Sequence, residues 1–253
     1  MSTSAIYHTD ADDIPQVSLT DKCIVLDLDL TLICTEENFD LKKSGILTDP
    51  KLLHLRQRIY DISIEDHEMP GEGTHYEFWG VSRPHVQEFL IFCFSYFKIV
   101  AVWSAGKRQY VDEIVKYLFK DLPYPHVVFT HDDIVYTENA EDPERREVTK
   151  PLTNMIESNP TLQKYMSLKN TYMIDDNYTN FFPNPDNGIL IPAYNPASLS
   201  AIQKDDYALL QLKNWLLQDE VANSDDIREL DKSKIFATSL RESMKNISPR
   251  RFI

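Results

Sequence analysis

The sequence has few cysteines, and it lacks both a long apolar segment and an N-terminal signal core. No apolar run reaches the roughly 18 residues that a membrane-spanning helix needs, and the first residues, MSTSAIYHTDADD, are polar and acidic. The three cysteines, Cys23, Cys34 and Cys93, lie in apolar stretches without the spacing of a disulfide or metal site. We therefore expect a soluble intracellular protein of the nucleus or cytoplasm, with reduced thiols.

Other scarcities exclude particular kinds of chemistry. None of the cysteines has an arginine six positions later, as the phosphate loop of a cysteine-dependent phosphatase requires. The chain has only six glycines and no Gly-Lys-Ser or Gly-Lys-Thr, so a Walker-type nucleotide loop is absent. Its net charge of -14 argues against general binding to nucleic acid or to an acidic membrane. A phosphorylated substrate held by a local positive site remains compatible with that charge.

What is present is an alternation of short apolar strands with helical segments. At 253 residues and 42% hydrophobic content, the chain is long enough for one large globular domain. Strands are expected at the start of 23–33 and at 98–104, 127–130, 170–176 and 188–193; helices at 85–97, 107–119 and 206–218, with another beginning at 151. This order predicts an α/β, three-layer sandwich with a central parallel, Rossmann-like sheet.

Segments of different composition flank or interrupt this domain, which we place at 22–238. Residues 1–21 are expected to be a flexible acidic leader, and the basic tail at 239–253 either contacts a partner or an acidic surface or is disordered. A long polar insertion covers 36–80, with helical spacing at 52–62 and a strand near its end at 75–82. Residues 131–149 are expected to form a loop or a hairpin.

Paired acids end two of the expected strands. Asp27 and Asp29 are two residues apart, so in an extended segment they point to the same side. Two carboxylates at the mouth of a buried strand need a cation or a shared proton, and Mg²⁺ prefers such oxygen ligands. Asp175 and Asp176 end another strand, which favours one shared metal site. Taken singly, the first pair could be a solvated loop and the second an ordinary turn.

Two further residues could bind an anion. Ser104 ends a strand and is followed by Ala105-Gly106, where a hydroxyl and free N–H groups lead into a helix. Its alternative role is a simple helix N-cap. Lys150 stands just before Pro151 and the next helix; a lone lysine is otherwise most often at the surface.

These residues occur in an order that resembles a known family. The segments are DLDLTL (27–32), SRPHVQEFL (82–90), VWSAGK (102–107), KPL (150–152) and IDDN (174–177). Together they resemble the haloacid dehalogenase-like superfamily, and within it the RNA polymerase II C-terminal-domain phosphatases of the small CTD phosphatase and NLI-interacting-factor-like group. The likeness covers roughly 22–218. Leu30, His85 and Pro151 depart from that group's usual Glu, Gly and Asp. The 36–80 insertion is also longer than in the small phosphatases.

The resemblance implies a mechanism and a role for each residue. Asp27 would attack phosphorus and form an aspartyl-phosphate, while Asp29 would serve as acid and then base. Mg²⁺ would be held by the Asp27 carboxylate, the Asp29 backbone carbonyl and the Asp175/Asp176 pair, with Asp176 as the direct ligand. Ser104 and Lys150 would hold the phosphoryl oxygens. Thr31 would orient the Asp27 loop, although it could equally be a turn residue.

The resemblance also implies a substrate, with alternatives left open. Phosphoserine or phosphothreonine in a protein or peptide is the leading expectation, with neither direct nucleic-acid binding nor membrane contact. A nucleotide, a nucleic-acid end or a small metabolite would be favoured if 36–80 formed a helical cap over the site. A non-catalytic binding module on the same fold would be expected to have lost a catalytic acid, yet both Asp27 and Asp29 are present.

Overall fold

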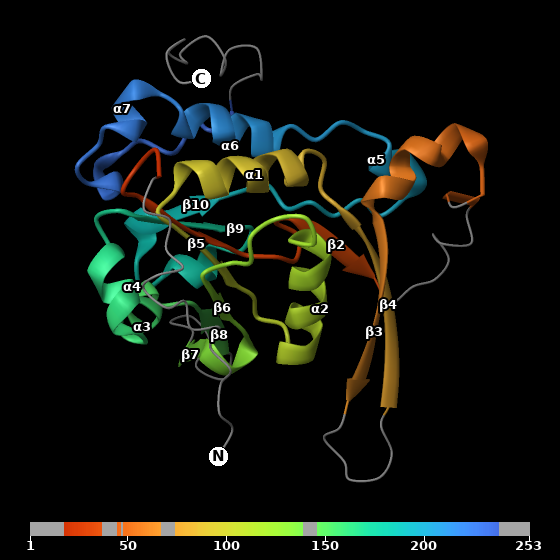
Figure 1. Cartoon of the computed structure of the whole chain (residues 1–253), viewed down its shortest axis with the longest axis horizontal. Coiled ribbons are helices and arrows are strands. Elements are labelled where there is room, and N and C mark those ends of the chain that lie inside the picture. Colours follow the sequence, from red (N-terminus) through yellow and green to blue (C-terminus); the bar gives the residue numbers. More distant parts are fainter. Residues whose placement is uncertain (1–17, 37–44, 47, 67–73, 139–145, 238–253) are drawn as a thin grey trace.

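A five-stranded parallel sheet forms the centre of the molecule (Figure 1). In this computed structural model, the described residues are 18–36, 45–46, 48–66, 74–138 and 146–237. The strand order is β10-β9-β1-β5-β6, with β1 paired to both β5 and β9 in parallel register. The strands are β1 (Cys23–Leu26), β5 (Ile99–Trp103), β6 (Val127–Phe129), β9 (Thr171–Asp175) and β10 (Gly188–Leu190). All five lie within the segments predicted from the sequence.

Helices cover both faces of this sheet. Alternate residues of β1 enter two different cores: Ile24 and Leu26 share one with helices α1, α2 and α6, whereas Cys23 and Val25 share the other with α3 and α4. Figure 1 accordingly shows α1 and α6 on one side of the sheet and α3 and α4 on the other. The helices are α1 (Val86–Tyr96), α2 (Arg108–Leu118), α3 (Leu152–Glu157), α4 (Pro160–Tyr165) and α6 (Ala208–Leu216). The predicted three-layer α/β sandwich is confirmed.

Shorter elements connect these layers. They are α5 (Leu199–Ile202), α7 (Asp219–Ala222) and the 3₁₀ turns η3 (Pro50–Arg58), η4 (His131–Asp133), η5 (Tyr178–Phe181), η6 (Pro185–Asn187) and η7 (Ile227–Glu229). Within 131–149, β7 (Val135–Glu138) and β8 (Arg146–Thr149) pair antiparallel. Among the described residues, no helix combines the length and apolar character needed to cross a membrane.

The insertion after the first strand contributes a second, antiparallel sheet. Its order is β2-β4-β3, from β2 (Ile33–Glu36), β3 (Ile59–Asp66) and β4 (Thr74–Ser82). The strand expected at 75–82 is confirmed. The helix expected over 52–62 is wrong beyond Arg58, where η3 ends and β3 begins. The reason is the period: buried Tyr60, Ile62 and Ile64 alternate with exposed residues, the pattern of a strand with one covered face.

The two ends of the chain are only partly within the described residues. Residues 1–17 of the expected leader and the whole 239–253 tail fall outside them. Residues 18–21 are described and anchored, because the backbone N–H and the hydroxyl of Thr20 donate to the Tyr96 carbonyl at 3.0 and 2.9 Å. Thr20 therefore holds these last four residues of the expected leader against the end of α1. All three cysteines are buried free thiols, as their apolar surroundings predict.

Candidate active site

Asp27 follows directly on the carboxyl end of β1, the central strand of the sheet, and a tight turn comes after it. The Asp27 N–H donates to the Ile174 carbonyl at 3.0 Å, which extends the β1–β9 ladder by one residue. The Leu28 carbonyl then accepts three N–H groups, those of Thr31, Leu32 and Ile33. Leu30 adopts φ 60°, a left-handed conformation that is uncommon for a residue with a side chain. The turn leaves the Asp27 carboxyl 7% exposed.

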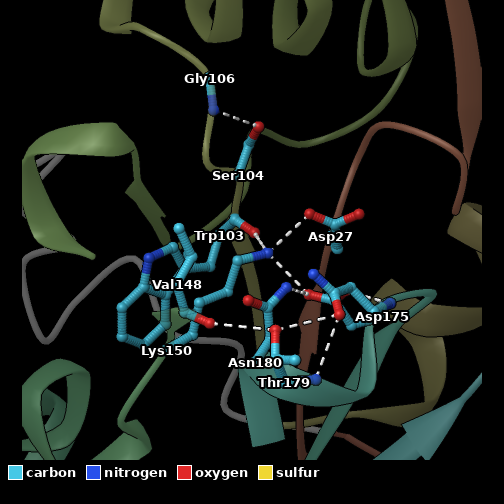
Figure 2. A network of polar contacts seen from close by, with 10 residues as sticks. Asp27, Trp103, Ser104, Gly106, Val148, Lys150, Asp175, Thr179 and Asn180 are labelled. Atoms are coloured by element: carbon cyan, nitrogen blue, oxygen red, sulfur yellow. Dashed lines mark hydrogen bonds and ion pairs between the residues drawn. The ribbon is translucent and has the colours of Figure 1, made fainter. Parts of the chain in front are cut away.

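A buried lysine joins three parts of the chain at this turn. The Nζ of Lys150 lies 2.7 Å from both Asp27 Oδ1 and Asp175 Oδ2, and it donates to the Trp103 carbonyl at 2.9 Å (Figure 2). All three ammonium hydrogens therefore have acceptors. Burial alone would lower the Lys150 pKa, but the two carboxylates outweigh it and raise the pKa. The surface position that is usual for a lone lysine is wrong here.

Three carboxylates gather around this cation. Ligand atoms of Asp27, Asp175 and Asp176 all lie within 4.8 Å of one another. Burial, reinforced by the charge of Asp175, raises the pKa of both Asp27 and Asp176. One ammonium group cannot balance three ionised carboxylates, so the cluster, with Asp27 and Asp175 buried and Asp176 half-buried, carries an excess of negative charge when all three are ionised. Closely spaced carboxylate oxygens are what Mg²⁺ prefers, and this donor set fits a divalent cation.

Asp175 is held on both of its oxygens. Oδ1 accepts the Asn177 N–H at 2.9 Å, and Oδ2 accepts from Lys150 and from Asn180 Nδ2, the latter at 2.8 Å (Figure 2). The Asn180 carbonyl also accepts the backbone N–H of Lys150 at 3.1 Å. Asn180 was not predicted, because its η5 position has no pattern that reveals a contact with a lysine thirty residues earlier.

Ser104 lies beside this cluster at the end of β5. Its N–H donates to the Phe129 carbonyl at 3.1 Å, and its hydroxyl oxygen accepts the Gly106 N–H at 3.0 Å. The N-cap of α2 is Lys107, so the alternative role of Ser104 as a helix cap is wrong. Gly106 allows a close approach: a Cβ there would lie 2.7 Å from Tyr110 Cδ1. The hydroxyl hydrogen of Ser104 has no acceptor among the described residues.

Thr31 is fully buried, but its side chain makes no hydrogen bond to the described residues. Its carbonyl accepts from Arg83 Nη1 at 3.0 Å. Arg83 also donates to the Pro192 carbonyl at 2.7 Å and forms a two-bond pair with the Asp206 carboxylate at 2.9 and 3.0 Å. The turn is thus tied to the segment after β10 through an arginine that the sequence did not single out.

Asp29 lies apart from the three-carboxylate cluster, in a group of hydroxyls. Its Oδ1 accepts a short hydrogen bond from the Tyr110 hydroxyl and a longer one, 3.3 Å, from Thr35 Oγ1. Thr35 Oγ1 is also 2.5 Å from the Tyr110 hydroxyl and 2.7 Å from the Tyr60 hydroxyl. Burial raises the pKa of Asp29, and the two hydrogen bonds partly offset that effect. Sequence reasoning missed these three hydroxyl residues, since they come from three separate elements: Thr35 from β2, Tyr60 from β3 in the insertion and Tyr110 from α2.

A groove opens next to this hydroxyl group, between the small sheet and α2. Its volume is about 440 Å³. Apolar and aromatic side chains predominate in its wall, with Lys107 at its edge; the lining residues include Ile64, Tyr76, Phe78, Lys107 and Tyr110. Tyr110 therefore contacts Asp29 and lines the groove at the same time.

Known proteins with related sequences place this site in a family. The profile of the family described as NLI interacting factor-like phosphatase matches residues 22–228. The chain belongs to this family. The matched range includes Asp27, Asp29, Ser104, Lys150 and the Asp175/Asp176 pair. The resemblance drawn from the five sequence segments is confirmed.

Other members of the NLI interacting factor-like phosphatase family are similar over much of this chain. The ubiquitin-like domain-containing CTD phosphatase 1 of Danio rerio is 31% identical over 178 residues, which cover 68% of this chain and 50% of that protein. Its Drosophila melanogaster counterpart is 30% identical over 158 residues, 62% of this chain and 46% of that protein. The chain spans about half the length of the curated relatives it matches.

Solved structures of the RNA polymerase II CTD phosphatase Fcp1 share the fold. The fission yeast enzyme bound to beryllium fluoride aligns with a TM-score of 0.53 at 16% identity, covering 76% of this chain and 48% of that one. A second Fcp1 structure aligns with a TM-score of 0.54 at 17% identity, covering 88% and 60%. At these identities the likeness establishes the haloacid dehalogenase-like fold of this family member.

Proposed function

We propose that this chain is a magnesium-dependent phosphatase that hydrolyses phosphoserine or phosphothreonine in proteins through a phosphorylated Asp27. The observation that carries the proposal is the buried cluster in which Asp27 lies against Lys150, within reach of Asp175 and Asp176. A phosphatase needs a nucleophile and cationic groups at one point, and the cluster has both.

Asp27 would act as the nucleophile through its second oxygen. Oδ1 accepts the Lys150 hydrogen bond, whereas Oδ2 has no partner among the described residues. Attack by Oδ2 forms the bond from Asp27 to phosphorus as the bond from phosphorus to the serine or threonine oxygen breaks. A water molecule then attacks phosphorus, which releases phosphate and restores the carboxylate.

The excess negative charge supports a divalent cation at this cluster. Both oxygens of Asp175 already have hydrogen-bond partners, so Asp27 and Asp176 would contribute carboxylate ligands, with the Asp29 backbone carbonyl as a further one. Mg²⁺, when bound, would screen Asp27 from the phosphate. Two unit charges 4 Å apart repel by about 4 kcal/mol at an effective dielectric constant of 20. That is roughly a thousandfold in rate.

The remaining residues would handle the phosphoryl oxygens and the protons. Ser104 can donate its free hydroxyl hydrogen to a phosphoryl oxygen, and Lys150 supplies positive charge next to it. Asp29 would donate a proton to the leaving oxygen and later accept one from water. Burial raises the Asp29 pKa, which favours a protonated form for the first step.

The surroundings of the site support a protein substrate over a small molecule. The described part of the 36–80 insertion is built mainly of a nine-residue 3₁₀ helix, η3, and two antiparallel strands. Of these only the strands line the groove beside the site, which argues against the helical cap that would favour small molecules. An apolar groove beside Asp29 could accept side chains that flank a phosphorylated residue. The names of the relatives, CTD phosphatases, also favour a phosphorylated protein.

The decisive test is substitution of the nucleophile. Asp27→Asn should reduce hydrolysis of p-nitrophenyl phosphate by on the order of 10⁴-fold or more, and EDTA should abolish it until Mg²⁺ is restored. The control is Asp219→Asn on α7, an exposed acid outside the site, which should leave turnover unchanged. Turnover retained by Asp27→Asn would rule out this mechanism. An inactive wild-type protein that still binds phosphopeptide would indicate a binding module instead.

A panel of phosphopeptides, nucleotides and sugar phosphates tests the substrate class. We expect kcat/KM to be at least tenfold higher for phosphoserine or phosphothreonine peptides than for any small phosphate. The reverse order would favour a metabolite or nucleotide phosphatase with the same site.

A further inference from the structure

The small antiparallel sheet aligns Thr35 and Tyr60 with Asp29. Thr35 on β2 and Tyr60 on β3 are both register partners of Gly80 on the central strand β4. A Cβ on Gly80 would lie 2.3 Å from the Tyr60 hydroxyl oxygen, so the tyrosine occupies the space that a side chain would fill. The missing side chain lets Tyr60 reach across β4 to within 2.7 Å of Thr35 Oγ1 on the far strand.

The number of hydroxyl hydrogens in this group determines which residue donates to which. Tyr60, Thr35 and Tyr110 each have one hydroxyl hydrogen to donate, and the Asp29 carboxylate can only accept. Thr35 Oγ1 lies 2.5 Å from the Tyr110 hydroxyl oxygen and 3.3 Å from Asp29 Oδ1, so its one hydrogen goes to the nearer Tyr110. Tyr110 then donates to Asp29 Oδ1, and Tyr60 donates to Thr35. This arrangement gives each hydroxyl one hydrogen bond as donor, and the chain of three hydroxyls ends on one carboxylate oxygen, Oδ1. Oδ2 has no hydrogen-bond partner among the described residues.

We propose that Tyr110 and Thr35 are positioning residues that hold Oδ1 of Asp29, so that only Oδ2 exchanges a proton with the substrate. The inference rests on the acid and base role of Asp29 in the proposed function. A carboxyl group otherwise rotates about its last torsion with a broad, twofold preference. The Tyr110 hydrogen bond to Oδ1 restricts that rotation, Thr35 restricts the Tyr110 hydroxyl, and Tyr60 in turn restricts Thr35.

The consequence is specific to the proton-transfer steps. In the first, the Oδ2–H bond breaks and the proton joins the leaving oxygen as its bond to phosphorus breaks. In the second, Oδ2 takes a proton from the water whose oxygen bonds to phosphorus. A leaving group such as nitrophenolate departs with little help, whereas a serine alkoxide needs the proton. Loss of the positioning hydroxyls should therefore matter most for alkyl phosphates.

Tyr110→Phe tests this with the ring left in place. The ring packs edge-on against Phe78 at 5.8 Å between centroids, and the substitution removes only the hydroxyl. We expect kcat/KM to fall by no more than about threefold for p-nitrophenyl phosphate and by about 30-fold for a phosphoserine peptide, with phenyl phosphate between them. The matched control is Tyr117→Phe on the same helix, whose hydroxyl contacts Arg58 and Ser82 instead. It should change every substrate less than twofold.

Substitutions at Thr35 and at Asp29 separate positioning from folding. Thr35→Val should make kcat/KM depend more steeply on the leaving group, as Tyr110→Phe does. Thr35→Ser should keep the wild-type dependence, because serine retains the hydroxyl. In an Asp29→Asn background, Tyr110→Phe should have no further effect on the leaving-group dependence. Equal losses for all leaving groups, or additive losses in the double variant, would overturn the inference. An inactive wild type or an active Asp27→Asn would instead contradict the proposed function itself.

Discussion

The two sheets of this protein contribute to the site in different ways. The parallel sheet brings charged groups together: Asp27, Lys150 and Asp175 are nearly fully buried and compensate one another at 2.7 Å. The antiparallel sheet contributes neutral hydroxyls and an apolar groove wall, which reach the site only at Asp29. Buried charge is expensive to leave unpaired, whereas hydroxyls and apolar surface can be replaced at modest cost. We therefore expect substitutions in the charged cluster of the parallel sheet to change the stability of the whole molecule most. Substitutions in the antiparallel sheet should have a smaller effect on stability and should change substrate selectivity.

The strongest test of this difference between the two sheets is to remove the buried ammonium group of Lys150. Lys150→Met keeps much of the side-chain volume but leaves Asp27 and Asp175 without their shared ammonium group. We expect the free energy of unfolding, measured by urea denaturation in EDTA at neutral pH, to fall by about 3–5 kcal/mol.

The matched control is Lys213→Met. Lys213 Nζ lies 2.7 Å from Glu88 Oε1, but this pair is open to solvent, with the glutamate side chain 52% exposed. Its loss should cost less than about 1 kcal/mol. Equal losses for the two variants would mean that burial does not distinguish the charges at the site from those at the surface.

The next largest effect concerns Asp176, the carboxylate proposed as a ligand of Mg²⁺. The pKa of Asp176 is raised, first by burial and then by Asp175, above its ordinary value of 3.8. A carboxyl group with a raised folded pKa destabilises the protein above its unfolded pKa and has no such effect well below it. In EDTA, Asp176→Asn should therefore raise the melting temperature at pH 7, and the gain should vanish below about pH 4.

Magnesium should reverse the order of stability of the wild type and the Asp176→Asn variant. At a hundred times its Kd, Mg²⁺ should stabilise the wild type by about 2.7 kcal/mol and Asp176→Asn by less. Asp186→Asn, an exposed acid on η6, serves as the control and should respond to Mg²⁺ as the wild type does. Equal stabilisation of all three proteins would argue against Asp176 as a ligand.

A smaller effect is expected at the centre of the antiparallel sheet. Gly80→Ala places a methyl group within 2.5 Å of both the Tyr60 hydroxyl and the Cys34 carbonyl, so the strand or the ring must shift. We expect a loss of about 2 kcal/mol of stability, measured by urea denaturation, together with slower turnover of phosphopeptides. Ser63→Ala, at an exposed position on β3, should stay within about 0.5 kcal/mol of the wild type. Similar values for the two variants would contradict the close approach of Tyr60 to β4.

The smallest effect should appear in the groove. Tyr76 is 46% exposed, and Tyr76→Ser removes part of the apolar wall without touching the charged cluster. We expect kcat/KM for a phosphopeptide to fall by about tenfold, and that for p-nitrophenyl phosphate to change less than twofold. Tyr124→Ser, at an exposed tyrosine outside the groove, should change neither. A loss shared by both substrates would place Tyr76 in the catalytic machinery rather than the substrate groove.

Most of the parallel domain could be predicted because its signals are local. Each buried strand is a short apolar run, each main helix has a broad apolar face, and β1, β5 and β9 lead directly into the polar residues of the site. The insertion was harder. The spacing of Leu52 and Leu55 suggested a helix, but at Ile59 the period changes to that of a strand. A strand of that kind is stabilised by its partner, β4, which the sequence around Ile59 does not reveal.

The sequence by itself determined the acidic strand ends, the order of the motifs and hence the family, because these depend on residue types at short spacings. Only the tertiary structure decided which residues meet. Lys150 reaches Asp27 across 123 positions, and Tyr110 reaches Asp29 across 81. It also decided that Asp29 is held by hydroxyls of β2 and of α2, apart from the carboxylate cluster. The physical reason is that a buried charge or hydroxyl needs a hydrogen-bonding partner. The fold brings that partner from a distant part of the chain, so the neighbouring sequence does not reveal it.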